Sequence, residues 1–278
     1  MLHVFCYHRI TEEPVAHDHW GLAVSRARFE EQLQALSQRM SLLNLARMDL
    51  EEAMGSPDDH ALISFDDIYR EVIDLALPVL EAFEATALLF VAGSFLDRSS
   101  FWWDQLENLH VALPPEEREE RIASLWAWLR DLPLEEKELA LAHMRRVGRA
   151  EPLAPQQRPL RLEELKGISR RAHVRFGGHT MSHPWLPSLT PAAMEEEIRT
   201  GHALLAAHTG QEPIAFAYPY GAWDGPSRSA VAACGYRIAF TTQPPSPSEA
   251  EVRGHDHLTY PRLCVGNWSG EDLINRLA

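Results

Sequence analysis

The sequence predicts an α/β protein built on a parallel sheet or barrel. Short apolar runs alternate with amphipathic stretches along most of the 278 residues. Apolar runs with polar boundaries are typical of strands buried on both faces of a parallel sheet, and the intervening helical patterns complete βαβ units. Hydrophobic residues make up 45% and charged residues 24% of the chain. Both values are ordinary for a globular protein and exclude a disordered or coiled-coil chain.

The expected elements follow in chain order. Ser25 is expected to cap the first helix, and Thr190 caps the long helix in which Pro191 occupies the first turn. Strands are expected at residues 2–7, 61–65, 87–91, 174–177, 215–218 and 237–241. Helices are expected at residues 28–40, 74–83, 162–169, 191–208 and 227–234.

Residues from about 104 to 150 interrupt the alternation. They are rich in Glu, Leu, Arg and Ala, contain no strand-like run, and form two helical patterns separated by proline. We expect a helical insertion within a single domain that spans residues 1–278. Residues 150–159 resemble a linker, and residues 243–251 a Pro/Ser loop.

Charge and cysteine content narrow the function classes. The chain has 40 acidic and 26 basic residues, so it lacks the basic surface that a nucleic-acid partner requires. No apolar run approaches the ~20 residues of a membrane-spanning helix, and the first residues lack a secretory signal pattern. Cys6, Cys234 and Cys264 are too few and too scattered for a disulfide framework. We therefore expect a cytoplasmic protein; the sequence carries no signal for its oligomeric state.

Two acidic residues directly follow a predicted strand. Asp66 and Asp67 come after the apolar run ALISF, and ligands of parallel α/β proteins sit at the carboxyl ends of strands. Adjacent carboxylates on an extended chain point to different sides. One can therefore bind a cation while the other acts as a base. The alternative is that one of them caps the following helix.

A histidine pair follows a later strand. His179 and His183 are four residues apart, a spacing at which two imidazoles can chelate one metal ion. A surface histidine pair is the alternative for an isolated match. Together with a carboxylate after another strand, however, the pair forms a set of two imidazoles and one carboxylate. Such a set leaves coordination positions open for water, as a catalytic zinc site requires.

The sequence Tyr-Pro-Tyr-Gly at residues 218–221 ends another predicted strand. Pro219 restrains the backbone, and Gly221 permits a close backbone approach. The backbone N–H that follows Pro219 is a candidate oxyanion donor. An ordinary strand-end turn with a packed tyrosine is the alternative.

These motifs, in this order, resemble the NodB-homology polysaccharide deacetylases, carbohydrate esterase family 4. The resemblance covers most of the chain except the helical insertion. It points to the branch of the family that has an N-terminal YHRI motif and a YPYG motif. The matching segments are FDD at 65–67, HTMSH at 179–183, YPYG at 218–221, YHRI at 7–10, residues 21–33 and 77–97, FWWD at 101–104 and TYPRLCV at 259–265.

The resemblance implies an irregular TIM-like (β/α)7 barrel and metal-dependent removal of acetyl from an N-acetylated sugar. Asp67, His179 and His183 would bind a divalent metal, zinc first, with cobalt, nickel and manganese as alternatives. Asp66 would be the general base that deprotonates the metal-bound water. The amide of Tyr220 would help to stabilise the oxyanion.

The sequence departs from the family pattern in three places. Ile68 replaces the glycine of the usual FDDGY motif, which predicts a narrowed site or a shifted Asp67. Ala217 replaces the arginine that in the family version of the third motif orients the base. The late Leu-x-His motif that supplies the general acid is not evident.

Other residues are candidates for the missing roles. Relatives with the YH motif use that histidine near the N-terminus, so His8 is the candidate general acid; its alternative is a packing role. Arg262 would position Asp66 or bind a substrate anion, or form a structural ion pair. We expect Trp103, Asp104 and Tyr218 to contact substrate, with a core position as the alternative for the tryptophan.

The main hypothesis from the sequence is a metal-dependent N-deacetylase acting on a polysaccharide, an oligosaccharide, or a lipid- or nucleotide-linked N-acetyl sugar. Two alternatives stand beside it. One is a catalytically impaired family member that binds a glycan or a partner. The other is a hydrolase of a non-sugar amide.

Overall fold

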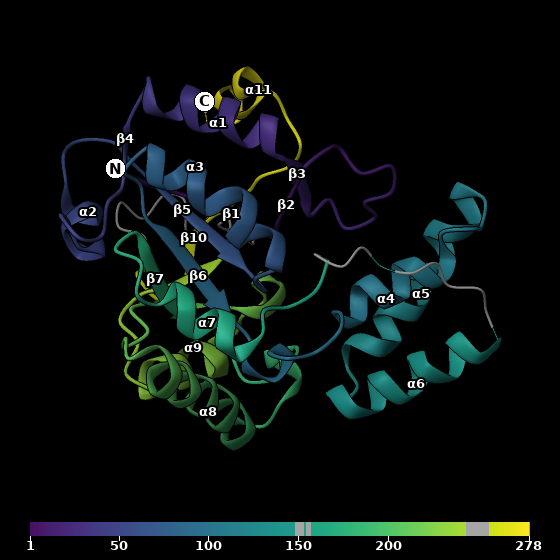
Figure 1. The fold of residues 1–278 in the computed structure, drawn as a ribbon. Helices are drawn as coiled ribbons and strands as arrows, with labels where there is room; N and C mark the ends of the chain where they lie inside the picture. Colours follow the sequence, from purple (N-terminus) through teal and green to yellow (C-terminus); the bar gives the residue numbers. More distant parts are fainter. Residues whose placement is uncertain (148–152, 154–156, 243–255, 278) are drawn as a thin grey trace.

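A parallel β-barrel forms the centre of the protein in the computed structural model, which describes residues 1–147, 153, 157–242 and 256–277 (Figure 1). Each strand pairing of this barrel is parallel. The strand order is β11-β1-β5-β6-β7-β8-β9-β10, with β4 paired to β5. The strands are β1 (Leu2–Tyr7), β4 (Ser41–Leu42), β5 (His60–Asp66), β6 (Ala87–Val91), β7 (Val174–Gly178), β8 (Phe216–Ala217), β9 (Ala239–Thr241), β10 (Tyr260–Pro261) and β11 (Leu263–Cys264). A separate small sheet pairs β2 (Arg9–Thr11) with β3 (Ala23–Ser25).

The barrel closes at Arg262. The strand β10 pairs with β9, β11 pairs with β1, and only Arg262 separates β10 from β11. The two edges of the sheet are therefore halves of one short segment. If this segment is taken as one strand bent at Arg262, the described barrel path has seven strands, and β4 pairs with β5 outside this path. The predicted irregular (β/α)7 barrel is confirmed.

Helices surround the barrel and bury one face of its strands (Figure 1). On β5, Ile63 and Phe65 pack outward with residues of the surrounding helices, whereas Leu62 packs with Leu88 and Phe90 inside the barrel. This alternation follows from the two-residue period of a strand. The surrounding helices are α1 (Arg26–Ser37), α2 (Leu50–Gly55), α3 (Leu77–Ala82), α7 (Leu162–Ile168), α8 (Pro191–Thr209), α9 (Gly225–Ala233) and α11 (Gly270–Asn275).

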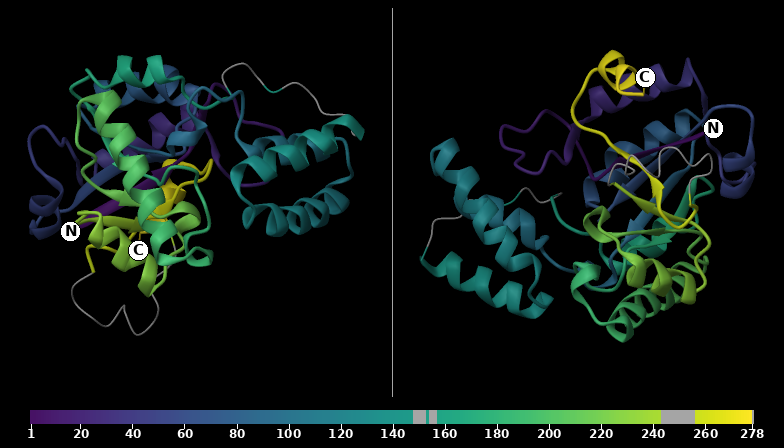
Figure 2. Two further views of the ribbon diagram at one scale, coloured as in Figure 1. Left: turned by 90° about the horizontal axis from the view of Figure 1, so that it is seen from below. Right: turned by 180° about the vertical axis from the view of Figure 1, so that it is seen from behind.

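The helical insertion forms a lobe beside the barrel in all three views (Figures 1 and 2). Its described part consists of three helices, α4 (Trp102–His110), α5 (Pro115–Arg130) and α6 (Leu134–Val147), so it begins two residues earlier than predicted. The loop between β2 and β3 reaches toward this lobe (Figure 1). There the backbone N–H of His19 donates a hydrogen bond to Glu107 of α4 at 2.9 Å.

Most predicted elements are present, with ends that lie within three residues of the predicted ones. The helix expected at 74–83 begins as one π-helical turn at Val72–Ala76 before α3. Thr190 caps α8 as predicted, by accepting a hydrogen bond from the Ala193 N–H. Ser25 occupies the N-cap position of α1, but its hydroxyl bonds Asn267 and not the helix. The predicted loop at 243–251 and most of the predicted linker lie outside the described residues.

The described helices are each too short or too polar to cross a membrane.

One close contact fixes α8 against the loop that follows β7. A Cβ atom added at Gly201 of α8 would lie 2.5 Å from the carbonyl oxygen of Thr180 and 3.0 Å from the Met181 nitrogen. These are backbone atoms that cannot move aside independently. Glycine at this position therefore sets the distance between α8 and residues 179–183.

We predict that Gly201→Ala destabilises the protein by about 1–3 kcal/mol, because the added methyl group forces the helix and the loop apart. Gly167→Ala is the matched control, since this exposed glycine of α7 has nothing within 4 Å of its added Cβ. The control is expected to be neutral or to stabilise by up to about 1 kcal/mol. Urea unfolding measures both, and equal effects of the two substitutions would contradict the close contact.

Candidate active site

A cavity of about 410 Å³ lies at the carboxyl ends of the barrel strands. Because the strands are parallel, these ends meet at one mouth of the barrel. The cavity collects residues from the ends of several strands and from the lobe. Its lining residues are His8, Trp20, Leu22, Asp66, Asp67, Trp103, Trp126, His179, His183, Trp185, Tyr220, Gly221, Thr242 and Cys264.

Asp67, His179 and His183 meet at the floor of this cavity. Each offers a ligand atom within 4.8 Å of the others, and all three side chains are buried. Asp67 Oδ1 lies 3.4 Å from His183 Nε2 and 3.7 Å from His179 Nε2. These distances exceed those of ordinary hydrogen bonds. They match the separation of about 3.4 Å between two ligands of a tetrahedral zinc ion at ~2.1 Å.

The backbone orients the His179 ring. Its Nδ1 lies 2.7 Å from the carbonyl oxygen of Ala217 on the neighbouring strand β8. A carbonyl only accepts, so Nδ1 carries the proton and Nε2 is left with its lone pair directed at Asp67. This arrangement is typical of a metal-ligating histidine.

The three side chains fit a cation. Within the described part of the chain, the buried Asp67 Oδ1 and His183 Nδ1 have no hydrogen-bond partner. Burial raises the pKa of Asp67, and the neighbouring Asp66 charge raises it further. Burial lowers the pKa of both histidines. A carboxylate buried beside two neutral imidazoles is costly by itself, and a divalent ion removes that cost.

The loop that carries both histidines is held from two sides. The Thr180 hydroxyl accepts a hydrogen bond from the His183 N–H at 3.0 Å. Glu197 of α8 accepts hydrogen bonds from the N–H groups of Met181 and Ser182 and from the Ser182 hydroxyl. These contacts position both ligands without using their ring nitrogens.

Backbone strain is concentrated at the site. Asp67, Ile68, Thr180, His183 and Tyr220 all have φ between 51° and 65°. This left-handed region is unfavourable for side chains with a Cβ, and most of all for a β-branched residue such as Ile68. The tight turn explains why glycine is usual at position 68. Here the buried Ile68 side chain joins the core outside the barrel, and Asp67 still meets the two histidines.

Arg262 pairs with Asp66 inside the barrel. Its two terminal nitrogens donate to the two carboxylate oxygens of Asp66 at 2.7 and 2.6 Å. The guanidinium lies over the ring of Phe90 and is fully buried. Burial alone would raise the pKa of Asp66, but the Arg262 charge outweighs it and holds this pKa below its ordinary value. Ala217 has no side chain that can orient Asp66, and Arg262 reaches that carboxylate from the closing segment.

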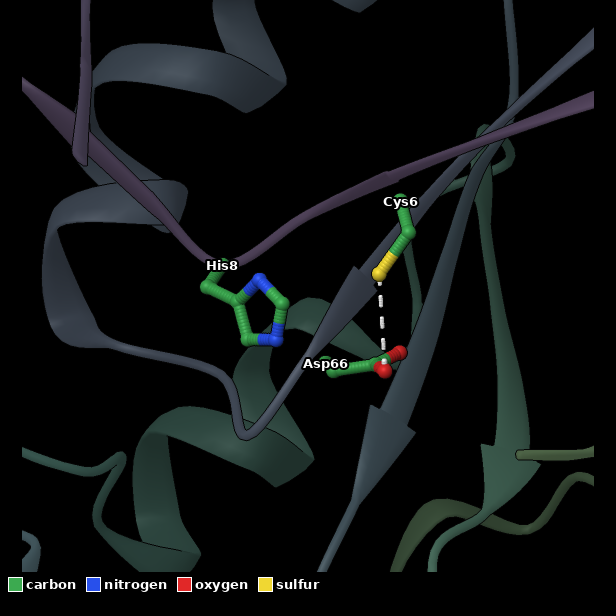
Figure 3. Close-up of side chains that lie close together, drawn as sticks. All are labelled: Cys6, His8 and Asp66. Atoms are coloured by element: carbon green, nitrogen blue, oxygen red, sulfur yellow. Dashed lines mark hydrogen bonds between the residues drawn. The ribbon is translucent and has the colours of Figure 1, made fainter. Parts of the chain in front are cut away.

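His8 and Cys6 flank the same carboxylate (Figure 3). The Cys6 thiol donates to Asp66 Oδ2 at 3.5 Å, and ligand atoms of Cys6, His8 and Asp66 lie within 4.8 Å of one another. Burial lowers the pKa of His8 to about 4, so its ring is neutral at neutral pH. Its position beside Asp66 is that of a group able to exchange a proton with it.

Tyr220 covers the outer side of His183. The two rings have centroids 4.5 Å apart, and the Tyr220 hydroxyl donates to the His183 carbonyl at 3.4 Å. The residue lines the cavity at the turn after β8.

Trp103, Asp104 and Tyr218 were expected to contact substrate, and of these Trp103 lines the cavity. Trp103 Nε1 donates to the Tyr69 hydroxyl at 2.8 Å, and that hydroxyl donates to Asp104 at 3.1 Å. Asp104 is buried and ties α4 to the turn after β5. Tyr218 is also fully buried, with its hydroxyl bonded to the Leu258 carbonyl. Asp104 and Tyr218 therefore lie outside the cavity lining, and their contact with substrate stays a prediction.

Sequence reasoning missed several residues at the site. Trp20, Trp126 and Trp185 line the cavity, Cys6 contacts Asp66, and Glu197 holds the histidine loop. Each lies outside the short motifs, and folding of the chain brings it to the site. The sequence does not show whether an aromatic residue on an amphipathic helix, such as Trp126, lines a cavity or packs in the core.

A comparison with protein families identifies the family of this chain. The sequence model of the family described as polysaccharide deacetylase matches residues 54–239. This range contains the three candidate metal ligands. A search of curated proteins found no match.

Solved structures share the fold along the whole chain. A Streptococcus pyogenes deacetylase, PplD, solved in complex with acetate, is 18% identical with a TM-score of 0.63, over 100% of this chain and 98% of that one. IcaB from Ammonifex degensii is 20% identical with a TM-score of 0.64, over 99% and 95%. A putative polysaccharide deacetylase from Bacillus anthracis is 18% identical with a TM-score of 0.66, over 100% and 69%. At these identities the likeness concerns the fold.

We predict that Asp104 makes stability depend on pH. Burial raises the pKa of Asp104 to about 7, above the value near 3.9 of an unfolded aspartate. Between these values the folded state binds more protons than the unfolded state, so stability falls as pH rises from about 4 to 7. Asp104→Asn removes this contribution, and melting temperatures across that range should decline less than in the wild type. Equal slopes for the two proteins would contradict the raised pKa.

Proposed function

Because the chain belongs to the polysaccharide deacetylase family, we propose that it is a metal-dependent hydrolase that removes N-acetyl groups from a carbohydrate or sugar conjugate. The observation that carries the proposal is that Asp67, His179 and His183 meet in one cavity that Asp66, paired with Arg262, also lines. It combines three ligands for a cation with a separate carboxylate. Metal-assisted hydrolysis needs both kinds of group.

Asp67, His179 and His183 would hold the divalent metal, with zinc as the first candidate because two imidazoles and a carboxylate suit it. Such an ion, when bound, activates water and polarises an acetamido carbonyl. The Ala217 carbonyl fixes His179, and Thr180 fixes the backbone of His183. The ligands are therefore preorganised by groups that do not themselves react.

Asp66 is the proposed proton acceptor. The Arg262 pair holds its carboxylate in one orientation and keeps it ionised. An ionised carboxylate that lies beside the cation site can take the proton of the attacking water at one of its oxygens.

His8 is the proposed proton donor to the leaving amine. Because its ring is neutral at neutral pH, it must first receive a proton. Asp66 is close enough to pass on the proton that it accepts. The pair would then move one proton from water to the amine in each turnover, without a net change in either residue.

Tyr220 is the proposed oxyanion donor. Tyr220 has a left-handed backbone conformation, and it lies in a turn that lines the cavity next to His183. A backbone N–H that is held in a strained turn needs no reorganisation during the reaction.

We also propose that residues 1–278 act as one catalytic domain. Trp103 and Trp126 of the helical lobe line the same cavity as the candidate metal ligands from the barrel. A glycan-binding protein that has lost catalysis and a hydrolase of a non-sugar amide are the competing functions. Acetate release from sugar and non-sugar amides separates the three.

We predict different outcomes for the two adjacent aspartates. Asp67→Asn removes a ligand charge and should weaken metal binding by roughly 100-fold or more. Asp66→Asn should retain the metal but lower kcat by at least about 100-fold, because it removes the proton acceptor. Elemental analysis and acetate release measure the two effects. Full turnover by Asp66→Asn would exclude Asp66 as the base. If the wild type binds no metal even after zinc is added, the function of a glycan- or partner-binding protein would be favoured.

We predict that His8→Gln lowers kcat roughly 100-fold and leaves metal content unchanged, because it removes the proton donor but no metal ligand. His257→Gln is the control: this exposed histidine lies outside the cavity lining. Its kcat should equal that of the wild type. Equal rates for the two variants would remove His8 from the mechanism.

A further inference from the structure

Two cysteines that are distant in the sequence meet at the segment that closes the barrel. The parallel strands β1 and β11 pair Cys6 with Cys264 in register, and both are free thiols. Paired residues of neighbouring strands point to the same face of a sheet, and the strands lie about 4.8 Å apart. This spacing falls within the range of Cα separations, ~4.4–6.8 Å, that a disulfide bond spans.

A hydrogen bond joins the two thiols. The Cys6 S–H lies between two acceptors, the Cys264 sulfur and Asp66 Oδ2, the latter at 3.5 Å. The hydrogen bond from Cys6 lowers the pKa of Cys264, burial opposes this effect, and the nearby Arg262 charge lowers the pKa further. Burial raises the pKa of Cys6, so this thiol keeps its proton. The reactive thiolate form is therefore favoured at Cys264 and not at Cys6.

The two thiols also differ in their access to solvent. Cys264 is exposed and lines the cavity, whereas Cys6 is fully buried. A small oxidant that enters the cavity therefore reaches Cys264 first. Cys6 lies behind it, in position to react with the oxidised sulfur. An accessible thiolate beside a second, resolving thiol is the arrangement of redox-sensitive cysteine pairs.

The third cysteine of the chain has different surroundings. Cys234 lies at the C-terminal end of α9, and its thiol donates to the Glu195 carbonyl at 3.8 Å. Burial raises the pKa of Cys234, and the Glu195 charge raises it further. Because the thiolate is the form that reacts with oxidants, Cys234 is the weaker nucleophile. It serves as an internal reference for the oxidation of Cys264.

We propose that Cys6 and Cys264 are a modification site, a thiol pair that a peroxide oxidises reversibly to a disulfide. In the first step the Cys264 thiolate attacks one peroxide oxygen. The O–O bond breaks, a sulfenic acid forms, and the departing hydroxide takes up a proton to give water. In the second step the Cys6 sulfur attacks the sulfur of this sulfenic acid. The S–S bond forms, the S–O bond breaks, and the hydroxide leaves as water with the Cys6 proton.

The disulfide would change the surroundings of Asp66. Cys6 loses the S–H that it donates to this carboxylate. The new bond also ties β1, which leads directly into His8, to the segment that carries Arg262. Since His8 flanks Asp66 and Arg262 orients it, a shift of either strand alters the proposed proton acceptor. Disulfide formation is independent of the proposed deacetylase function, and only its effect on the rate rests on that function.

The test treats the reduced, folded protein with hydrogen peroxide and follows the free thiols, the intact mass and the linked peptides. The three free thiols should fall to one, with the mass lower by two hydrogen atoms. Peptide mapping should show Cys6 joined to Cys264. Cys234 should be oxidised at least about ten-fold more slowly than Cys264. Dithiothreitol should restore all three thiols.

Three variants separate the roles of the cysteines. Cys264→Ser, a change at an exposed position, should prevent the reaction, because the oxidant does not reach buried Cys6. Cys6→Ala should stop at the sulfenic acid of Cys264, which dimedone traps. Cys234→Ser is the matched control and should form the disulfide at the wild-type rate. Melting temperatures identify any effect that comes from unfolding.

The inference would be overturned if peroxide left Cys6 and Cys264 reduced, if the linked peptides contained Cys234, or if Cys264→Ser were oxidised as fast as the wild type. Acetate release from N-acetylglucosamine oligomers tests the effect on the site. The kcat of the disulfide form should fall several-fold and recover with dithiothreitol, and an unchanged kcat would contradict the effect on Asp66. A reduced protein that releases no acetate would contradict the proposed function, and the thiol measurements would still decide this inference.

Discussion

The buried ion pair between Arg262 and Asp66 connects the architecture of this protein with its candidate chemistry. Arg262 is the single residue between β10 and β11, so the segment that closes the barrel also carries the guanidinium. A charge buried in a barrel interior is tolerated only with a well-aligned partner, and removing one partner typically costs ~3–5 kcal/mol. The closed barrel and the oriented carboxylate therefore depend on each other. Phe90 and Phe240 enclose the guanidinium, which keeps water from competing for the pair.

The candidate metal ligands depend on a second set of contacts, made by the backbone. Left-handed conformations at Asp67, Thr180 and His183 turn the chain sharply where each side chain must face the cavity. Such conformations persist only where surrounding contacts enforce them. Here Glu197 binds the histidine loop, and Gly201 allows α8 to approach it. The cost of strain at the site is offset by packing and hydrogen bonds in the layer behind it.

The lobe and the barrel contribute different properties to one cavity. The barrel brings carboxylates and imidazoles together at its strand ends, where chemistry is possible. The lobe adds aromatic surface, anchored through Tyr69 at one point and through Arg130 at another. Ring faces can distinguish substrates by shape and polarity, but they cannot move protons or bind a cation in place of the ligands.

The sequence by itself determined the parallel α/β architecture, the helical insertion and the family, because strand-helix periodicity and short motifs are local properties of the chain. It also marked Asp66, Asp67, His179 and His183, since the carboxyl ends of parallel strands share one mouth of a barrel. Only the tertiary structure decided that Arg262 holds Asp66 in place of the arginine that Ala217 replaces, that Asp104 and Tyr218 are buried supports, and that Trp126 lines the cavity. Those outcomes depend on which distant segments of the chain meet. They also depend on where side chains point in the segment that closes the barrel and in the helical lobe. No local pattern encodes such contacts, because they arise from packing the whole chain at once.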